Sequence, residues 1–433
     1  MHNNKYKDGF LDNLWTHYLD MIQNFSNPVF LNYGHNILFT PYKGIINFSL
    51  HLFKYFYRNI RYSSNYNLDS SKYLLLCSST KNNVEPLYNE LFEKLNKNSS
   101  TATYINFSSQ KTYLKRYLIK SFIHSFVLSV KLMFISYKYK KFKFKFKFFH
   151  VFINIFYGVH YKYIAKLIIN SVKPKTIIVN SERNANISTI LNLLKNSDIH
   201  TYYICNELPG SHLYPIISKK IFFWDEIHLT QVLDRSKFST GYIIGNYELQ
   251  NSSLKNQSEI NLFFKNFEQN KYVLFLDDYD GNPIRDKYKF TIKYNQFMYD
   301  ICKQNPNIYF IFKNRQYVQN VVPGQDQINI LPNTIIYNDE VDLSMFLGWN
   351  KLMAVGGVSS QGLYVASKLN IPTFRLFFED IQKPIPVIDQ NVQLINNQIQ
   401  LSEFLKQQTS IFRSNEYSKI ENISQKIIKI VSQ

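Results

Sequence analysis

Residues Asn350 to Leu376, NKLMAVGGVSSQGLYVASKLNIPTFRL, decide the fold because they predict a strand, a tight turn, a helix and a second strand. Leu352–Val355 is a short apolar run, typical of a strand buried in a parallel sheet. Gly356-Gly357 allows a sharp turn, and Ser359-Ser360 is expected to open a helix that ends before Pro372. Such a helix start directs backbone N–H groups at the strand's carboxyl end, which suits a phosphate. The alternative is an ordinary strand-to-helix turn with a serine cap.

The same alternation of strands and helices extends outward from this stretch. We expect a first set of strands at Tyr73–Ser78, Thr103–Phe107, Thr176–Asn180, Thr201–Cys205, Ile221–Trp224 and Tyr242–Gly245, and a second set at Tyr272–Leu276, Ile308–Phe312 and Thr334–Tyr337. Helical patterns separate most of these runs, as in parallel α/β domains. Before them, Phe10–Ile22 and Ile45–Ile60 are candidate amphipathic helices. The sequence therefore predicts two α/β domains.

Length and composition are those of a large globular protein. The 433 residues suffice for two or three domains, and 45% of them are hydrophobic. Cys77, Cys205 and Cys302 are far apart and match no metal spacing, which favours a reducing cytoplasm. The N-terminus MHNNKYKDGF lacks the apolar core of a signal peptide. No uncharged apolar run reaches about 18 residues, so we expect no spanning helix.

The net charge of +19 is concentrated in one segment. Residues 94–181 hold 17 Lys or Arg and no Asp or Glu, whereas the rest of the chain has 33 basic and 31 acidic residues. A long helix is expected over Lys111–Lys138, with one basic face made of Arg116, Lys120, His124, Lys131 and Lys138. The run KKFKFKFKFF (140–149) then alternates cations with Phe.

Cations beside Phe and Tyr, without acids, favour the surface of an anionic membrane. One alternative is a core helix with a solvated face, followed by a low-complexity loop. Another is single-stranded nucleic acid, for which no RNA-binding motif is present. We therefore predict a membrane-facing insertion over residues 111–160 and no nucleic-acid partner.

Four motifs follow one another in a meaningful order. They are IFFWDEIHLTQVLDRSKFSTGYIIGN (Ile221–Asn246), FLDDYDG (Phe275–Gly281), FIFKNRQ (Phe310–Gln316) and the serine pair Ser359-Ser360. Together they resemble bacterial GT-B glycosyltransferases that build capsule and other surface polysaccharides, above all the sialyltransferase-like and Kdo-transferase-like groups. The resemblance spans Ile178 to Leu376. It implies two Rossmann-like domains facing a cleft, a nucleotide-sugar donor, and a reaction without a metal or a further cofactor.

Two positions depart from that family's pattern. Arg315-Gln316 stands where the relatives have His-Pro, although Arg also binds anions through its planar fork. Val365 stands seven residues before Pro372, where many relatives place a Glu that contacts the donor ribose. The loss of that Glu favours a CMP-activated acidic sugar, such as a sialic-acid-like nonulosonate or Kdo, over a UDP-sugar.

Sugar transfer needs a base that takes the proton of the acceptor hydroxyl. Asp277, Asp278 and Asp280 follow the first strand of the second domain, and crowded carboxylates raise one another's pKa. The resemblance places the base in this motif, and we favour Asp278. Glu182 and Glu207 are the alternatives, with His212 after them. A solvated Asp-rich turn is the other interpretation of this motif.

The departing phosphate needs positive groups and N–H donors. Seven residues that follow strands are expected to bind the donor nucleotide: Lys313, Arg315, Asn338, Glu340, Gly357, Ser359 and Ser360. Asn338 and Glu340 are assigned by position alone, where GT-B enzymes bind the nucleobase. A solvated strand end is the alternative for Lys313 and Arg315.

Taken together, we expect an α/β protein of GT-B class. Its parts would be an N-terminal acceptor domain (1–249), a linker (250–270), a C-terminal donor domain (271–400) and a helical tail (401–433). The protein would be a cytoplasmic glycosyltransferase, peripheral on the inner face of the membrane, acting on a glycan or lipid-linked acceptor, with other polysaccharide-synthesis proteins as further partners. CDP-glycerol-type polyol phosphate transfer and a non-catalytic assembly protein are the rival hypotheses.

Overall fold

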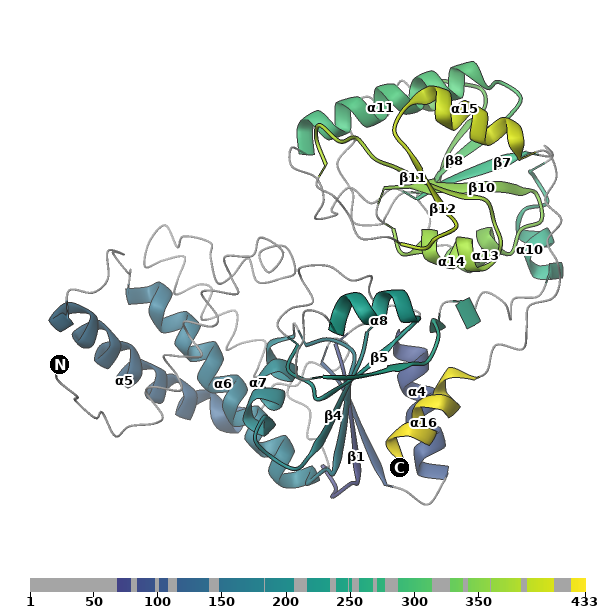
Figure 1. Cartoon of the computed structure of the whole chain (residues 1–433). Coiled ribbons are helices and arrows are strands. Elements are labelled where there is room, and N and C mark those ends of the chain that lie inside the picture. Colours follow the sequence, from purple (N-terminus) through teal and green to yellow (C-terminus); the bar gives the residue numbers. More distant parts are fainter. Residues whose placement is uncertain are drawn as a thin grey trace. The chain divides into compact units, whose positions relative to one another are not determined.

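The structure of the protein is a computed structural model (Figure 1). It describes residues 68–78, 84–97, 101–107, 115–139, 148–182, 184–205, 216–233, 239–247, 249–250, 257–267, 271–276, 287–313, 328–337, 342–358, 360–382, 388–408 and 422–433. The chain divides into two compact units, with the main boundary between Tyr242 and Ile243. The two expected N-terminal helices, Phe10–Ile22 and Ile45–Ile60, lie outside the described residues.

The first unit is built on a six-stranded sheet with the order β2-β1-β3-β4-β5-β6. Its strands are β1 (Tyr73–Cys77), β2 (Ala102–Asn106), β3 (Thr176–Val179), β4 (His200–Ile204), β5 (Lys220–Phe223) and β6 (Thr240–Ile243). The pairs from β2 to β5 are parallel. β1 and β3 are buried along their whole length, as expected for apolar strands covered on both faces. All six predicted strands are confirmed, with ends within two residues of those expected.

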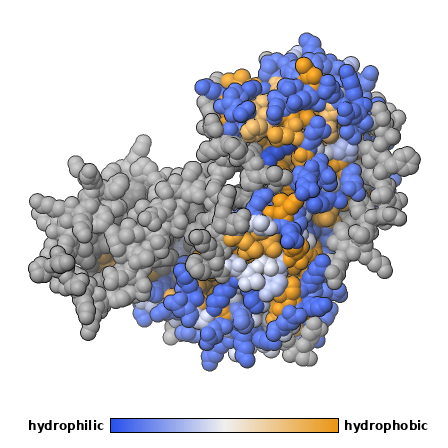
Figure 2. All heavy atoms as spheres, viewed as in Figure 1, coloured by the Kyte–Doolittle hydropathy of each residue, from blue (hydrophilic) through white to orange (hydrophobic). Residues whose placement is uncertain are grey.

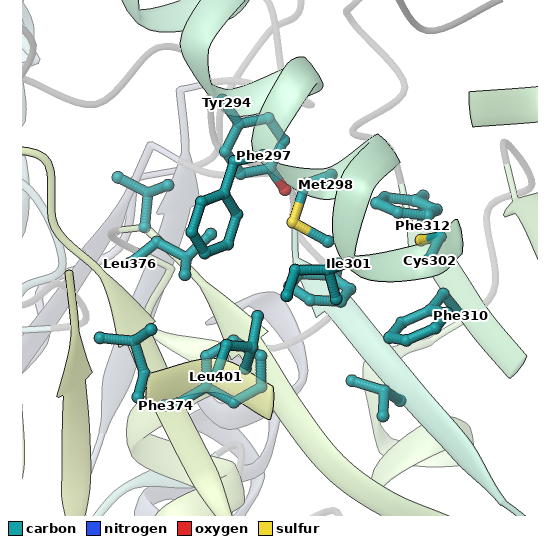
Figure 3. Close-up of a cluster of buried hydrophobic side chains, with 14 of the residues drawn as sticks. Tyr294, Phe297, Met298, Ile301, Cys302, Phe310, Phe312, Phe374, Leu376 and Leu401 are labelled. Atoms are coloured by element: carbon teal, nitrogen blue, oxygen red, sulfur yellow. The ribbon is translucent and has the colours of Figure 1, made fainter. Parts of the chain in front are cut away.

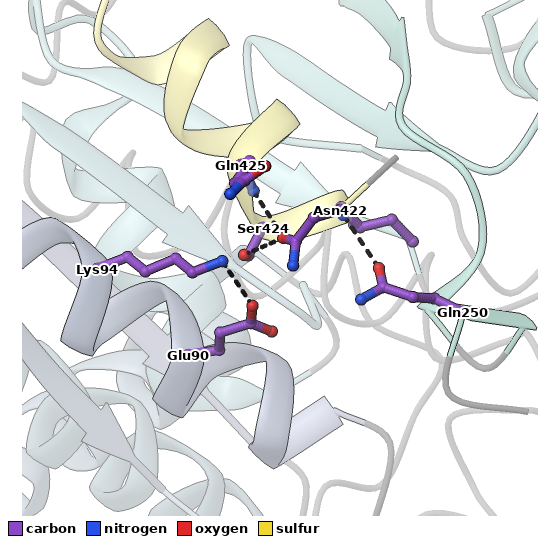
Figure 4. A network of polar contacts seen from close by, with 7 residues as sticks. Glu90, Lys94, Gln250, Asn422, Ser424 and Gln425 are labelled. Carbon is purple, nitrogen blue, oxygen red and sulfur yellow. Dashed lines mark hydrogen bonds and ion pairs between the residues drawn. The ribbon is translucent and has the colours of Figure 1, made fainter. Parts of the chain in front are cut away.

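The helices of the first unit are α4 (Val84–Lys97), α5 (Lys115–Tyr139), α6 (Phe148–Val172), α7 (Ala185–Leu194) and α8 (Glu226–Leu233). α4 has an apolar stripe that includes Leu87, Leu91 and Leu95, and this stripe is buried. On another part of α4, Lys94 pairs with Glu90 one turn earlier at 2.7 Å (Figure 4). Asn184 caps α7 by accepting from the N–H groups of Asn186 and Ile187.

The helix α6 was not expected from the sequence, which showed alternation of Lys and Phe over Lys140–Phe149 and gave no prediction for the residues from there to Thr176. The sequence of α6 has apolar residues on every face of the helix, so it lacks the one-sided apolar pattern by which an amphipathic helix is recognised. Residues 140–147 lie outside the described residues. α6 lies between α5 and α7 (Figure 1). Among the described helices, none combines the length and the apolar character needed to cross a membrane.

The contact between α5 and α6 combines aromatic rings with small polar residues. Tyr117 stacks on Tyr163 with ring centroids 5.5 Å apart. The Ser121 hydroxyl lies 3.3 Å from Nδ1 of the buried His160. The pair therefore packs closely along the side of α5 that carries Tyr117 and Ser121.

The second unit is built on a six-stranded sheet with the order β12-β11-β10-β7-β8-β9, in which every neighbouring pair is parallel. Its strands are β7 (Tyr272–Leu276), β8 (Tyr309–Lys313), β9 (Thr334–Tyr337), β10 (Leu352–Gly357), β11 (Thr373–Leu376) and β12 (Val392–Ile395). Its helices are α10 (Gln257–Phe263), α11 (Lys287–Gln304), α13 (Leu343–Leu347), α14 (Gly362–Lys368), α15 (Gln398–Gln407) and α16 (Ile423–Val431).

An aromatic core lies between the second sheet and its helices α11 and α15 (Figure 3). Phe275 of β7 stacks on Phe312 of β8 at 5.3 Å and meets Phe374 of β11 edge-on at 5.4 Å. Met298 of α11 and Leu401 of α15 belong to the same buried cluster. Each large side chain buried here stabilises the fold by about 1.5–3 kcal/mol.

Two expected boundaries of the second unit differ from the structure. The segment 250–270, expected to be a linker, contains α10 and then Phe264, which stacks on Trp349 with ring centroids 4.2 Å apart. The expected tail from residue 401 begins inside α15, whose Leu401 is fully buried in the core. The sequence pattern did not indicate α10, because this short helix lies among polar residues and buries only Ile260.

The C-terminal helix α16 is joined to residue 250 by a hydrogen bond. The Ile423 N–H donates to Oε1 of Gln250 at 3.0 Å (Figure 4). Asn422 caps the helix by accepting from the Gln425 N–H at 3.1 Å. The expected helical C-terminus over Ile420–Val431 is thus present from Ile423.

Replacing Phe264 with Ala should destabilise the second unit by about 3–5 kcal/mol, because it removes the ring stacked on Trp349 and leaves a cavity. Leu262→Ala is the matched control: this side chain, two residues earlier on α10, is 67% exposed, and its loss should cost little. Urea unfolding of both variants checks this. Equal stability of the two variants would contradict the docking of α10.

His160 generates a pH prediction, because burial lowers its pKa to about 4. An unfolded histidine has a pKa of about 6.5. Below that pH the unfolded state takes up a proton, while the folded state keeps His160 neutral until the pH nears 4. The neutral His160 therefore contributes fully to the free energy of unfolding above about pH 6.5. This contribution is lost as the pH falls towards the folded pKa of about 4, by up to about 3 kcal/mol.

We therefore expect His160→Gln to lose less stability than the wild type over that pH range, as measured by urea unfolding at a series of pH values. His200→Gln, which removes an exposed imidazole at the start of β4, is the control and should follow the wild type. Parallel curves for His160→Gln and the wild type would contradict the prediction.

Candidate functional site

A row of paired residues crosses the second sheet where its strands end. Lys313 of β8 pairs with Leu276 of β7, and Leu276 pairs with Gly357 of β10. The row continues to Tyr337 of β9 on one side and Arg375 of β11 on the other. Neighbouring strands lie about 4.8 Å apart, so the backbones of Lys313 and Gly357 are about 10 Å apart, with β7 between them. Two of the predicted binding residues thus share one edge of one sheet.

The order of the strands makes this edge a place where ligands bind in open α/β sheets. The chain passes from β7 through α11 to β8 on one side, and from β10 through α14 to β11 on the other. The connections diverge between β7 and β10, which leaves a crevice at their carboxyl ends in folds of this type. Gly357 and Leu276 therefore lie at the favoured position.

Glycines let the chain approach closely at this point. A Cβ on Gly357 would lie 2.8 Å from the Leu276 carbonyl oxygen, which is too close for any side chain. A Cβ on Gly356 would overlap the ring of Phe374. A Cβ on Gly362, at the start of α14, would lie 2.6 Å from a methyl group of Leu276 and 2.6 Å from a methyl group of Leu343. The turn after β10 is therefore pressed against the end of β7.

The helix after this turn starts later than the sequence suggested. α14 begins at Gly362 and has seven residues, whereas a start at Ser359 was expected. The Ser360 hydroxyl accepts a hydrogen bond from the Gly362 N–H at 3.3 Å, so it acts as a local cap. Ser359 lies outside the described residues. Because α14 is so short, its dipole would contribute little to the expected phosphate site.

Lys313 is half-buried at the end of β8. Burial lowers the pKa of its ammonium group, and the nearby carboxylate of Asp342 acts in the opposite direction. Asp342 also caps α13 by accepting from the Ser344 N–H at 3.0 Å. The sequence analysis did not select Asp342, although an Asp before a short apolar run is a helix-cap pattern.

Arg375 is the second residue that the sequence analysis missed. It is only 5% exposed, and its Nε donates to the carbonyl of Val358, just after β10, at 2.8 Å. Burial lowers the pKa of its guanidinium to about 10. A cation within the otherwise uncharged strand Thr373–Leu376 was the available signal, because a buried charge in a strand is rare without a partner or a function. Arg375 thus fixes the turn after Gly357, which the structure places at the end of β10 and not in the turn that the sequence predicted.

Eight further predicted residues lie outside the part of the chain that the structure describes: Asp277, Asp278, Asp280, Glu207, His212, Arg315, Asn338 and Glu340. Their assignments remain predictions, although the strands before Asp277, Arg315 and Asn338 end at the edge described above. In the part of the chain that the structure describes, no three His, Cys, Asp or Glu side chains gather closely enough to hold a metal ion.

Glu182, in the first unit, is the one predicted acid that the structure describes. Its carboxylate is buried and accepts from the backbone N–H groups of Ile217 and Ser218, the latter at 2.8 Å. Burial raises the pKa of Glu182, and the hydrogen bonds from Ser218 and Ile217 act against this shift. Because both carboxylate oxygens hold the segment before β5, these contacts describe a structural role.

Comparisons with known proteins identify the fold. No protein-family model matches the chain, and no curated protein matches its sequence. A UDP-GlcNAc 2-epimerase from Neisseria meningitidis, bound to UDP-GlcNAc, has a TM-score of 0.52 and 15% identity over 83% of this chain and 99% of that chain. An epimerase from Methanocaldococcus jannaschii, in complex with UDP-GlcNAc and UDP, gives the same four values.

The structure of S. aureus MnaA with UDP is also similar, with a TM-score of 0.51 and 12% identity over 84% of this chain and 96% of that chain. At such low identity, the likeness establishes the fold alone. The expected fold class is confirmed: two Rossmann-like sheets of six strands each, in a GT-B-like fold.

Replacing Glu182 with Gln should lower the free energy of unfolding of the first unit by about 1–3 kcal/mol, because the new amide group would face a backbone N–H donor. Glu226→Gln, at an exposed position in the first turn of α8, is the control and should change little. Chemical denaturation measures both. Unchanged stability together with lost turnover would instead restore Glu182 as a candidate base.

Proposed function

We propose that the protein is a glycosyltransferase that moves a sugar from a nucleotide donor, with the donor phosphate held at the carboxyl edge of the second sheet. The observation that carries the proposal is the row from Lys313 through Leu276 and Gly357 to Arg375. In this row Gly357, which ends β10 without a side chain, lies between Lys313 on one side and Arg375 on the other. It lies where the connections of the sheet diverge, which is the usual ligand position in such sheets.

The chemistry assigns a role to each group. In the transfer, an acceptor oxygen bonds to the anomeric carbon, the bond from that carbon to the nucleotide phosphate breaks, and the electron pair leaves with the phosphate. The half-buried ammonium group of Lys313 would stabilise that charge, and burial makes its effect larger than in water. Arg375 would act by fixing the turn at Val358, so that backbone N–H groups keep their place.

The acceptor must lose a proton in the same reaction. We assign this step to an acid of the motif that follows Leu276, with Asp278 favoured and Asp277, Asp280 and Glu207 as alternatives. Glu182 ranks below them because its carboxylate already accepts two backbone hydrogen bonds. The acceptor itself is proposed to be a growing surface polysaccharide or a lipid-linked glycan, bound by the first unit.

The nucleotide of the donor is a finer part of the proposal. Val365 has no polar group to offer a ribose, and it is buried within α14. Its identity is the basis of the preference for a CMP-activated acidic sugar. A UDP-sugar is the competing choice, and testing both nucleotides decides between them.

A second candidate is a nucleotide-sugar epimerase. The structures with a TM-score above 0.5 described above include two UDP-GlcNAc 2-epimerases, each matched over 99% of its chain. An epimerase would convert UDP-GlcNAc into its 2-epimer with no acceptor present, which nuclear magnetic resonance detects directly. Glycosyl transfer would instead require an added acceptor.

Lys313→Met should weaken nucleotide binding about tenfold or more, because it removes a charge-assisted contact and keeps the length of the side chain. A nucleotide at about 100 times its Kd stabilises the fold by about 2.7 kcal/mol, so thermal-shift assays with CMP, CDP and UDP measure the change. Lys303→Met, at an exposed position in the last turn of α11, is the matched control and should bind like the wild type.

Two results would count against the proposal. If no nucleotide shifts the melting temperature of the wild type, a non-catalytic protein becomes the better interpretation. If Lys313→Met binds as tightly as Lys303→Met, the phosphate does not lie at the end of β8.

A further inference from the structure

Exposed hydrophobic side chains are grouped on one helix of the first unit. Hydrophobic residues appear among hydrophilic ones on the described face in Figure 2, which is ordinary for a protein surface. On α5, however, five of them occur within twelve residues: Ile119 (69% exposed), Ile123 (59%), Phe126 (50%), Val127 and Val130. At about 100° per residue they form one stripe along the helix.

The buried side of α5 is more polar than this exposed stripe. Ser121, Ser125 and Ser129 recur every fourth residue and are fully buried. Each hydroxyl donates to the backbone carbonyl four residues earlier, at 2.5–2.7 Å, so burial leaves none of the three without an acceptor. A surface helix normally buries its large apolar residues and exposes its small polar ones. α5 also buries Leu118 and Leu128, but it leaves Ile119, Ile123, Val127 and Val130 exposed, so these four apolar side chains are available to a partner.

The charge around this stripe indicates what that partner is. No Asp or Glu occurs from Lys94 to Ser181, while this segment contains 17 Lys or Arg. Lys120, next to Ile119, is exposed, and its Nζ lies 5.2 Å from the ring centroid of Tyr163 on α6. Lys162 and Lys166 add two cations on α6. An apolar stripe with Lys120 at its edge, in a basic segment without acids, fits a surface that is apolar inside and anionic outside.

We propose that α5 lies along the surface of an anionic lipid bilayer, with Ile119, Ile123 and Val127 inserted among the acyl chains. The apolar stripe supplies burial and the lysines supply attraction to anionic headgroups. α5 would lie in the interface and not cross it, in keeping with the absence of a spanning helix among the described residues. This inference does not depend on the proposed glycosyl transfer.

A lipid surface fits α5 better than two other partners. A second copy of the chain would bring two basic segments together, and like charges disfavour such a contact. A nucleic acid would attract the lysines but would offer nothing to Ile and Val side chains, since single strands are bound by aromatic stacking. Both partners are outcomes of the experiments below, and both would overturn the proposal.

The first experiment is flotation of the intact protein with vesicles of equal parts phosphatidylglycerol and phosphatidylcholine. The triple variant Ile119→Ser, Ile123→Ser, Val127→Ser should bind about tenfold more weakly or worse. The control, Ile330→Ser with Ile399→Ser, removes two apolar side chains that are exposed in the second unit and should bind like the wild type. Circular dichroism and melting curves establish that both variants fold.

The second experiment reports insertion without removing the stripe. All three native cysteines are buried, so a single Ile123→Cys can be labelled with an environment-sensitive dye. Its emission should shift to the blue with the mixed vesicles and far less with pure phosphatidylcholine, and salt should weaken binding because the Debye length shortens to about 8 Å at physiological strength. The same dye at Ile330→Cys should report no change.

Three results would overturn the proposal. They are equal vesicle binding by the triple variant and the wild type, a dye shift that needs no vesicles and follows protein dimerisation, and a dye shift caused by single-stranded nucleic acid but not by vesicles.

Discussion

The close pairing of β7 with β10 is the constraint on which the second unit depends. Gly356 and Gly357 pair with Phe275 and Leu276, and no larger residue fits, because a side chain at either glycine would strike Phe374 or the Leu276 carbonyl oxygen. This contact brings together two strands that are far apart in the sequence. It also sets the point where the connections of the sheet diverge, and thereby the edge at which Lys313 and Arg375 lie.

The surroundings of that edge are built to hold it still. Phe275, Phe312 and Phe374 pack beneath the strands, and α11 and α15 cover them on one side (Figure 3). Arg375 then ties the turn after β10 to its neighbouring strand through the Val358 carbonyl. Groups that bind a charged ligand work best when they do not have to reorganise, and a rigid aromatic core under a glycine turn provides such a frame. In the first unit, by contrast, α5 leaves Ile119, Ile123 and Val130 exposed.

Much of the fold could be predicted from the sequence because buried parallel strands are short apolar runs. β7 and β9 have the bounds that the residues predicted, and the six strands of the first sheet are close to theirs. β12 was not predicted, because its residues VQLI are partly exposed at the sheet edge. α6 was not predicted, because its sequence is apolar on every face. Likewise, α10 depends on Ile260, Phe264 and Trp349, and contacts with residues far along the chain leave no local pattern.

The candidate site was only partly predictable for a similar reason. Lys313 directly follows the apolar run Ile308–Phe312, and Gly357 comes just after the apolar run Leu352–Val355. Their place at strand ends can therefore be inferred from the sequence. Arg375 lies inside a strand, and its role depends on the Val358 carbonyl of the neighbouring strand end, which only the register reveals. The length of α14 was overestimated because Ser359-Ser360 reads as a helix start, whereas the Ser360 hydroxyl caps the turn before Gly362.

A crystal structure of the protein grown with saturating UDP or CMP tests the central claim most directly. The account predicts that the nucleotide phosphates lie at the carboxyl ends of β7, β8 and β10, beside Lys313 and the turn after Gly357. A nucleotide bound at the opposite edge of the sheet, or crystals that take up neither nucleotide, would contradict it.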